Sequence, residues 1–250
     1  MVSGSRIRLE RILRDGRMLC MPMDHGISGG PSRGLEDPGA VIGQCARNGL
    51  NCVILNKGIL KALAEPPRAS VLVHLSASTS LSQSPDRKVL SGTVDEAAAM
   101  GADGISIHVN IGGADEPEML AQMGEVSSRC SDLGMPLLAM MYPRGANISD
   151  PHDPGIVSHV ARVGAEFGAD IVKVPYTGDA GSFRQVVRGT PVPVVIAGGP
   201  KASDESLLEM TRGAIEAGAA GVTYGRNIFG HDDPGGMTRR LAGIIFGGIP

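Results

Sequence analysis

Tryptophan is absent from this 250-residue chain, and aromatic residues make up only 3% of it. Few side chains are therefore available to stack on nucleic-acid bases. The chain also lacks a run of basic residues, and its formal net charge of -3 is close to neutral. Together these absences argue against a nucleic acid as partner.

Long apolar segments are missing as well. No stretch approaches the roughly 20 apolar residues of a membrane span, and the N-terminal MVSGSRIRLERILRDGR lacks the apolar core of a signal peptide. No CxxC pair occurs, and the four separate cysteines are Cys20, Cys45, Cys52 and Cys130. We expect buried, reduced cysteines in a cytoplasmic protein that has no membrane partner.

Short apolar runs alternate with stretches of helical periodicity, and each run is flanked by Gly, Pro or polar residues, as is typical of buried parallel strands. Eight such units in this length predict an α/β fold, the closed (β/α)8 TIM barrel, rather than a doubly wound open sheet. No linker divides the chain, so we expect a single domain over residues 1–250. The expected strands are residues 18–23, 52–55, 71–75, 104–109, 136–141, 170–174, 193–197 and 221–224.

Helices are expected at stretches such as 95–100, 116–133, 155–167 and 204–217, which carry apolar residues at helical spacing. The serine-rich segment 75–85 is expected to be a long loop between a strand and a helix. Active sites of such barrels lie at the carboxyl ends of the strands. The polar residues at those ends should therefore converge on one small-molecule site.

Lysine is scarce in this chain, with 5 lysines against 18 arginines. Lys173 interrupts the apolar run DIVKV, where a lysine is costly unless it is used. A neutral, buried amine can attack a ketone and form an iminium. The alternative is a lysine that only hydrogen-bonds carbonyls at the strand end. Near it, Asp24 and Tyr142 are candidate proton-transfer groups, although each also suits a purely structural role.

Glycine-rich turns follow the seventh and eighth expected strands, at Gly198-Gly199 and Gly225-Arg226. Backbone N–H groups in such turns bind phosphate, and barrels often place a phosphate at these two loops. Ordinary turn glycines are the alternative. A metal site built from His25, His74 and His108 is also conceivable, but without an HxH or HxxxH pair the signal is diffuse. We therefore expect no metal and no other cofactor.

Seven segments spread over nearly the whole chain are specific in combination. They are PMDHGIS (22–28), SASTSL (76–81), GADGISIHVNIG (101–112), MPLLAMMYPRG (135–145), DIVKVPYTGD (170–179), GGPK (198–201) and GRNIFGHDDP (225–234). Through them the chain resembles the archaeal-type class I aldolases of the DeoC/FbaB group. Within that group it is most similar to the synthases of 2-amino-3,7-dideoxy-D-threo-hept-6-ulosonate.

This resemblance implies that Lys173 forms the Schiff base, that Tyr142 donates the proton, and that Asp24 acts beside them as acid and base. In the family a phosphorylated ketose forms an iminium and loses an aldehyde, and the enamine adds to L-aspartate semialdehyde. Lys201 and His108 are accessory candidates. The implied substrate and phosphate contacts are His25, Gly26, Ile27, Ser28, Pro143, Arg144, Gly198, Gly199, Gly225 and Arg226.

The resemblance leaves the donor open between a deoxyketohexose phosphate and dihydroxyacetone phosphate. One alternative is an aldolase that uses dihydroxyacetone phosphate, such as a fructose-bisphosphate aldolase. Another is a barrel that binds phosphosugars without catalysis, but such a protein needs none of Lys173, Tyr142 and Asp24. The expected partners are small-molecule substrates, and relatives of this kind are homo-oligomers.

Overall fold

Each of the eight apolar runs forms a strand in the computed structural model, which describes residues 3–247. The strands pair in parallel and close a barrel in the order β1-β10-β9-β8-β7-β6-β3-β2. The predicted (β/α)8 barrel is therefore confirmed, with strand ends shifted by at most two residues. The bounds are β1 Met18–Pro22, β2 Cys52–Asn56, β3 Ser70–His74, β6 Gly104–Ile111, β7 Leu137–Pro143, β8 Ile171–Val174, β9 Val194–Ala197 and β10 Gly221–Thr223.

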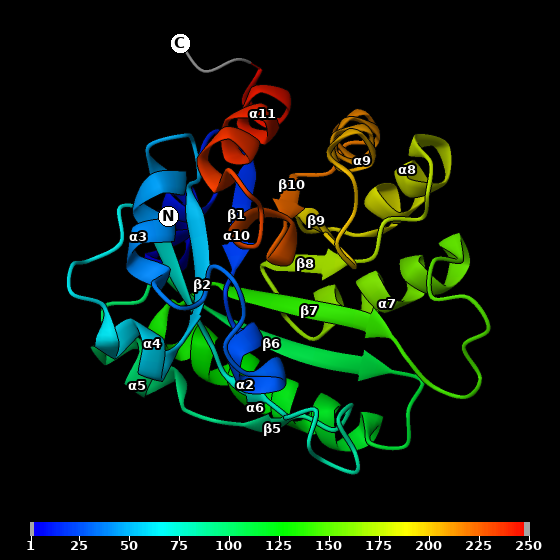
Figure 1. Cartoon of the computed structure of the whole chain (residues 1–250). Coiled ribbons are helices and arrows are strands. Elements are labelled where there is room, and N and C mark those ends of the chain that lie inside the picture. The colour runs from blue at the N-terminus through cyan, green and yellow to red at the C-terminus, as the bar shows by residue number, and fades with distance from the viewer. Residues whose placement is uncertain (1–2, 248–250) are drawn as a thin grey trace.

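Helices surround the strands (Figure 1). Three of them, α3, α7 and α11, begin with Asp-Pro, where the aspartate caps the helix and the proline fits its first turn. The bounds are α1 Gly4–Ile12, α2 His25–Gly29, α3 Pro38–Ala46, α4 Lys57–Ala62, α5 Val94–Ala99, α6 Glu116–Leu133, α7 Pro154–Glu166, α8 Ala180–Gly189, α9 Asp204–Glu216, α10 Arg226–Phe229 and α11 Pro234–Phe246.

Side chains that point into the barrel form a separate apolar cluster. It includes Cys20 and Cys52, which are register partners on β1 and β2, and Met140 on β7. Ile12 from α1 and Leu13 just after it belong to the same cluster, so this segment closes the amino-terminal end of the barrel. The opposite, carboxyl end is therefore the open end of the interior, where polar groups can meet a ligand.

The serine-rich segment is more ordered than a simple loop. It contains the short strand β4 (Ser76–Ala77), which pairs with β5 (Val89–Leu90) in an antiparallel sheet. The connection between them reaches α2, because the backbone N–H of Ser80 donates to the carbonyl of Ser28. This hairpin covers the carboxyl end of the barrel beside β3 and β6.

The four cysteines are buried and form no disulfide, as expected. Burial also raises the pKa of the Cys45, Cys52 and Cys130 thiols, which keeps them protonated. Within residues 3–247, every helix is too short or too polar to cross a membrane.

Candidate active site

A cavity of about 620 Å³ opens at the carboxyl ends of the strands. The three predicted catalytic side chains line it: Lys173 from β8, Tyr142 from β7 and Asp24 from the turn after β1. Because these strands are parallel, residues far apart in the sequence reach one end of the barrel together. The other predicted residues that line the cavity are His25, Ser28, His108, Arg144, Gly198, Gly199, Gly225 and Arg226.

Lys173 is only 6% exposed, and its sheet neighbours are Met140 on β7 and Val195 on β9. Its Nζ atom lies 3.8 Å from the sulfur of Met140 and 5.9 Å from the centre of the Tyr142 ring. No ion pair joins Lys173 to a carboxylate among residues 3–247. The amine therefore faces the cavity without a tight competing partner and can meet a carbonyl carbon there.

Asp24 lies between two imidazoles. Its Oδ1 atom is 3.6 Å from Nδ1 of His25, and its Oδ2 atom is 3.8 Å from Nε2 of His74. Asn56 donates from Nδ2 to the backbone carbonyl of Asp24 and holds the turn. Both Oδ1 of Asp24 and Nδ1 of His25 are buried with no hydrogen-bond partner in the described part of the chain.

Burial, balanced against neighbouring charges, decides the charge of this group. It lowers the pKa of His74 and of His25, and the nearby carboxylate offsets this only in part. For Asp24, burial opposes ionisation, but the two imidazoles and Lys173 outweigh it and lower the pKa of the carboxyl. Asp24 is therefore a carboxylate at neutral pH, beside two imidazoles that are mostly neutral.

Tyr142 stacks on His108, with ring centres 4.8 Å apart and ring planes tilted by 30°. The guanidinium of Arg144 lies 5.5 Å from the centre of the Tyr142 ring. Burial, together with the charge of Lys88, lowers the pKa of His108 to about 3. The hydrogen bond to Asn110 raises this pKa but does not offset the decrease. A neutral ring and a cation thus both pack against Tyr142.

The predicted glycine-rich turns are the loops after β9 and β10, and together they form one wall of the cavity, which we call the glycine wall. Gly199 has a φ of 63°, in the left-handed region that favours glycine. A Cβ on Gly225 would lie 2.5 Å from the His25 ring and 2.7 Å from the carbonyl of Pro22. Arg226 donates to the carbonyl of Gly199 and so links the two loops. The backbone can therefore approach an anion closely at this wall.

Asn227 is a positioning residue that lies at the predicted end of the eighth strand but was not among the predicted site residues. It is 4% exposed and donates from Nδ2 to the carbonyls of Gly198 and Pro200. Its Oδ1 atom accepts from the N–H of Ala202. Asn227 thereby fixes the β9 loop against the start of α10. The signal was its place next to Arg226, within the segment GRNIFGHDDP.

Four predicted residues do not line this cavity. Gly26 and Ile27 line a neighbouring apolar hollow of about 510 Å³ on the other side of α2. Pro143 is buried in β7, and the exposed Lys201 donates to the carbonyl of Gly230. These residues adjoin the site without facing the cavity.

Lys88 and the segment before it are the main part of the cavity lining that strand-end reasoning did not find. They come from the connection between β4 and β5, away from any barrel strand. The one available signal was that Lys88 is one of only five lysines. Lining residues from this segment are Ser78, Thr79, Ser80, Pro85, Asp86 and Lys88, and the remaining lining residues are Pro22, Met140, Ala197, Pro200 and Thr223.

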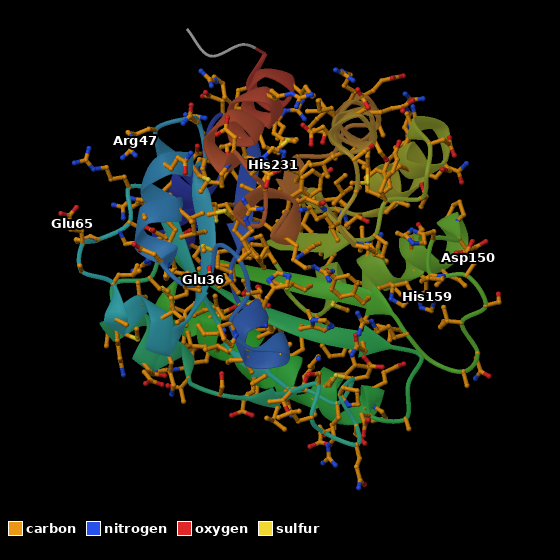
Figure 2. All side chains as sticks on the ribbon, viewed as in Figure 1. Glu36, Arg47, Glu65, Asp150, His159 and His231 are labelled. Carbon is orange, nitrogen blue, oxygen red and sulfur yellow. The ribbon has the colours of Figure 1, made fainter. Side chains whose placement is uncertain are left out.

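A larger hollow of about 830 Å³ lies on the outside of the barrel at α3 and the end of α4. Glu36, Arg47 and Glu65 line it and lie on that side of the molecule (Figure 2). It contains none of the predicted catalytic residues. No cluster of three or more His, Cys, Asp or Glu side chains suited to a metal occurs within residues 3–247. The chemistry-bearing groups are gathered in the 620 Å³ cavity.

Comparison with known families agrees with this geometry. The model of the DeoC/LacD family aldolases matches residues 18–231. The chain belongs to the DeoC/LacD aldolase family. This aldolase is 44% identical over 248 residues to 2-amino-3,7-dideoxy-D-threo-hept-6-ulosonate synthase 1 of Archaeoglobus fulgidus. That match covers 98% of the chain and 92% of the relative.

A second relative comes from Streptomyces griseus. This aldolase is 40% identical over 245 residues to its 2-amino-4,5-dihydroxy-6-oxo-7-(phosphonooxy)heptanoate synthase, with 96% of the chain and 89% of the relative covered. Among solved structures, a Schiff-base-forming fructose-1,6-bisphosphate aldolase superposes with a TM-score of 0.91 at 28% identity. It covers 97% of this chain and 99% of its own. The enzyme class predicted from the sequence is therefore confirmed as that of an aldolase.

Proposed function

We propose that this aldolase forms a Schiff base between Lys173 and a phosphorylated ketose and transfers the resulting enamine to L-aspartate semialdehyde. The observation that carries the proposal is a buried lysine on the cavity wall, with Tyr142 on the next strand and the carboxylate of Asp24 in the same cavity. A barrel that only binds phosphosugars has no need for this combination. Homo-oligomerisation and a cytoplasmic location stay predictions from the sequence.

The substrates follow from the products named for the two relatives. Both are seven-carbon keto acids with an amino group at carbon 2. Cleavage between carbons 4 and 5 of either one gives the same four-carbon amino aldehyde, aspartate semialdehyde. The remaining three carbons correspond to dihydroxyacetone phosphate for the Streptomyces product and to a hydroxyacetone unit for the Archaeoglobus product. The acceptor is thus common to both, while the donor differs.

The first chemical stage forms the iminium. The unprotonated amine of Lys173 adds to the ketone carbon of the donor, and the carbinolamine then loses water. Asp24 transfers the protons that this dehydration needs, and as a carboxylate it stabilises the positive charge of the iminium. When the donor is dihydroxyacetone phosphate, the glycine wall after β9 and β10, with Arg226, holds its phosphate.

The second stage makes the new carbon–carbon bond. Loss of a proton or of an aldehyde from the iminium gives the enamine, whose carbon attacks the aldehyde carbon of aspartate semialdehyde. The aldehyde oxygen becomes a hydroxyl and takes its proton from Tyr142. Hydrolysis of the iminium then releases the product and restores the free amine of Lys173.

Product analysis tests the proposal. Purified protein is mixed with aspartate semialdehyde and one donor, either dihydroxyacetone phosphate or a deoxyketohexose phosphate, in separate reactions. The products are identified by mass. A seven-carbon amino keto acid from one of the donors is the expected result. Product only with glyceraldehyde 3-phosphate as acceptor would instead assign a fructose-bisphosphate aldolase.

A further inference from the structure

Lys88 is a buried cation inside the cavity. It is 9% exposed, and its ammonium donates to the hydroxyl of Ser78 and to the carbonyl of Pro85. An ammonium has three donors, so one remains for a ligand. No ion pair links Lys88 to a carboxylate within the described residues 3–247. A buried cation of this kind is costly unless an anion meets it in the working complex.

An acid and a second base accompany Lys88. Asp86 pairs with Arg144 at 2.6 Å, and its backbone carbonyl accepts from the amide of the buried Asn110. Burial, followed by the charge of Arg144, lowers the pKa of Lys88, whereas Asp86 opposes that shift. Two bases and one acid leave a net charge of about +1. His108 adds no charge near neutral pH, since its pKa is about 3.

The order of strands puts this cluster opposite the glycine wall. The glycine wall follows β9 and β10, whereas Lys88 enters between β3 and β6, and four strands separate the two places in either direction around the barrel. Lys173 on β8 and Tyr142 on β7 lie between them. Dihydroxyacetone phosphate held by its phosphate at the glycine wall therefore leaves the far side of the cavity, beside Tyr142, for the second substrate.

We propose that Lys88, Ser78, Asp86 and Arg144 form an acceptor pocket that recognises the α-amino and α-carboxylate groups of an amino-acid aldehyde. Lys88 and the hydroxyl of Ser78 bind the carboxylate, and Asp86, oriented by Arg144, binds the ammonium. The aldehyde end of the acceptor then points towards Tyr142, against which Arg144 already packs. This inference rests on the proposed function and adds the residues that select its acceptor.

The mixed charge of the pocket favours an amino acid over a phosphate. A phosphate group would meet the two cations but offers no partner to the carboxylate of Asp86. An amino-acid head group carries one charge of each sign, and the pocket offers a partner to each. Thr79 and Ser80 line the same part of the cavity and add polar groups without charge.

Three acceptors distinguish recognition of the carboxylate from recognition of the ammonium. Aspartate semialdehyde has both groups, succinic semialdehyde lacks the ammonium, and propanal lacks both. With the donor that the wild type uses, Lys88→Met should lower kcat/KM for both semialdehydes by roughly 10- to 100-fold, the range of a lost charge-assisted hydrogen bond. Its kcat/KM for propanal should change by less than about 3-fold. Asp86→Asn should lower kcat/KM by about 10-fold for aspartate semialdehyde but not for succinic semialdehyde.

Two exposed residues outside the cavity supply matched controls. Lys61→Met and Asp95→Asn remove the same charges, from side chains that pair with Glu96 and Arg129, and should leave all three acceptors unaffected. Equal loss with propanal, or loss of donor trapping by borohydride, in Lys88→Met would overturn the acceptor pocket. If Lys88→Met selectively lowered kcat/KM for glyceraldehyde 3-phosphate, the pocket would instead be assigned to a phosphate group. If the wild type forms no product from aspartate semialdehyde, the proposed function itself fails.

Discussion

The imidazole of His74 faces the carboxylate of Asp24, with Nε2 3.8 Å from Oδ2. On its other side, Nδ1 of His74 lies 2.8 Å from the hydroxyl of Ser106. Because a carboxylate only accepts, the arrangement favours the tautomer that carries its proton on Nε2 and accepts from Ser106. His74 is buried on β3 and therefore lies against Asp24 from inside the barrel, where it can orient the carboxylate.

Replacing His74 should thus impair Asp24 without touching substrate. We expect His74→Asn, which keeps a polar atom near Ser106 only, to lower kcat by about 10-fold or more with little change in KM. His74→Gln reaches towards Asp24 and should retain more activity. Steady-state kinetics with both variants decide this, and equal activities of the two variants would show that the Asp24 side of the ring is unimportant.

Lys173 should be the site of covalent attachment. Borohydride added with the donor should increase the mass of the peptide that contains Lys173 by that of the reduced donor, because the iminium forms there. Lys173→Met should lose both the adduct and the activity, while Lys57→Met, which removes a lysine paired with Glu96, should keep the adduct. Peptide mapping that finds the adduct on Lys88 or Lys201 would refute the assignment.

Tyr142→Phe separates the two chemical stages. Iminium formation should remain largely intact, since Lys173 and Asp24 are unchanged. Formation of the carbon–carbon bond should slow by roughly 100-fold or more, the usual range for a lost general acid or base. Borohydride trapping measures the first stage and product formation the second. Parallel loss in both assays would mean that Tyr142 mainly supports the packing of His108 and Arg144.

The barrel could be predicted because buried parallel strands leave a plain signal, an apolar run between Gly, Pro and polar residues. The same reasoning places Lys173, Tyr142 and Asp24 together, since each lies near or just after the carboxyl end of a strand. The helix α2 escaped it, because HGISG holds two glycines in five residues and has little helical propensity of its own. Packing at the end of the barrel, rather than local preference, makes it helical.

Lys88 could not be placed from the sequence for a related reason. Lys88 lies between β4 and β5, which are only two residues long. Strands this short show no recognisable alternation of apolar and polar residues. Its entry into the cavity depends on contacts between distant segments, such as Ser80 with Ser28 and Asn110 with Asp86. The acceptor side of the cavity therefore needed the structure, whereas the covalent side did not.

Stability should fall as the solution becomes acidic, and His108 should account for a measurable part of this. Its pKa in the folded chain is about 3, well below the ordinary value of 6.5, so between these values only the unfolded chain binds the proton. Stability is then greatest above pH 6.5 and declines as the pH falls towards 3. At pH 5 the loss from His108 alone is on the order of 2 kcal/mol. The lowered pKa values of His25 and His74 act in the same direction.

His108→Gln tests this linkage, because the glutamine amide can still donate to Asn110 but does not titrate. Asp24 contributes little to the comparison, since its lowered pKa keeps it ionised throughout the range from pH 7 to 5. Urea unfolding at several pH values should give a shallower loss of unfolding free energy for the variant than for the wild type. Identical slopes would show that His108 is protonated equally in the folded and unfolded chain, which would mean that its ring is not shielded from water by Tyr142 and Asn110.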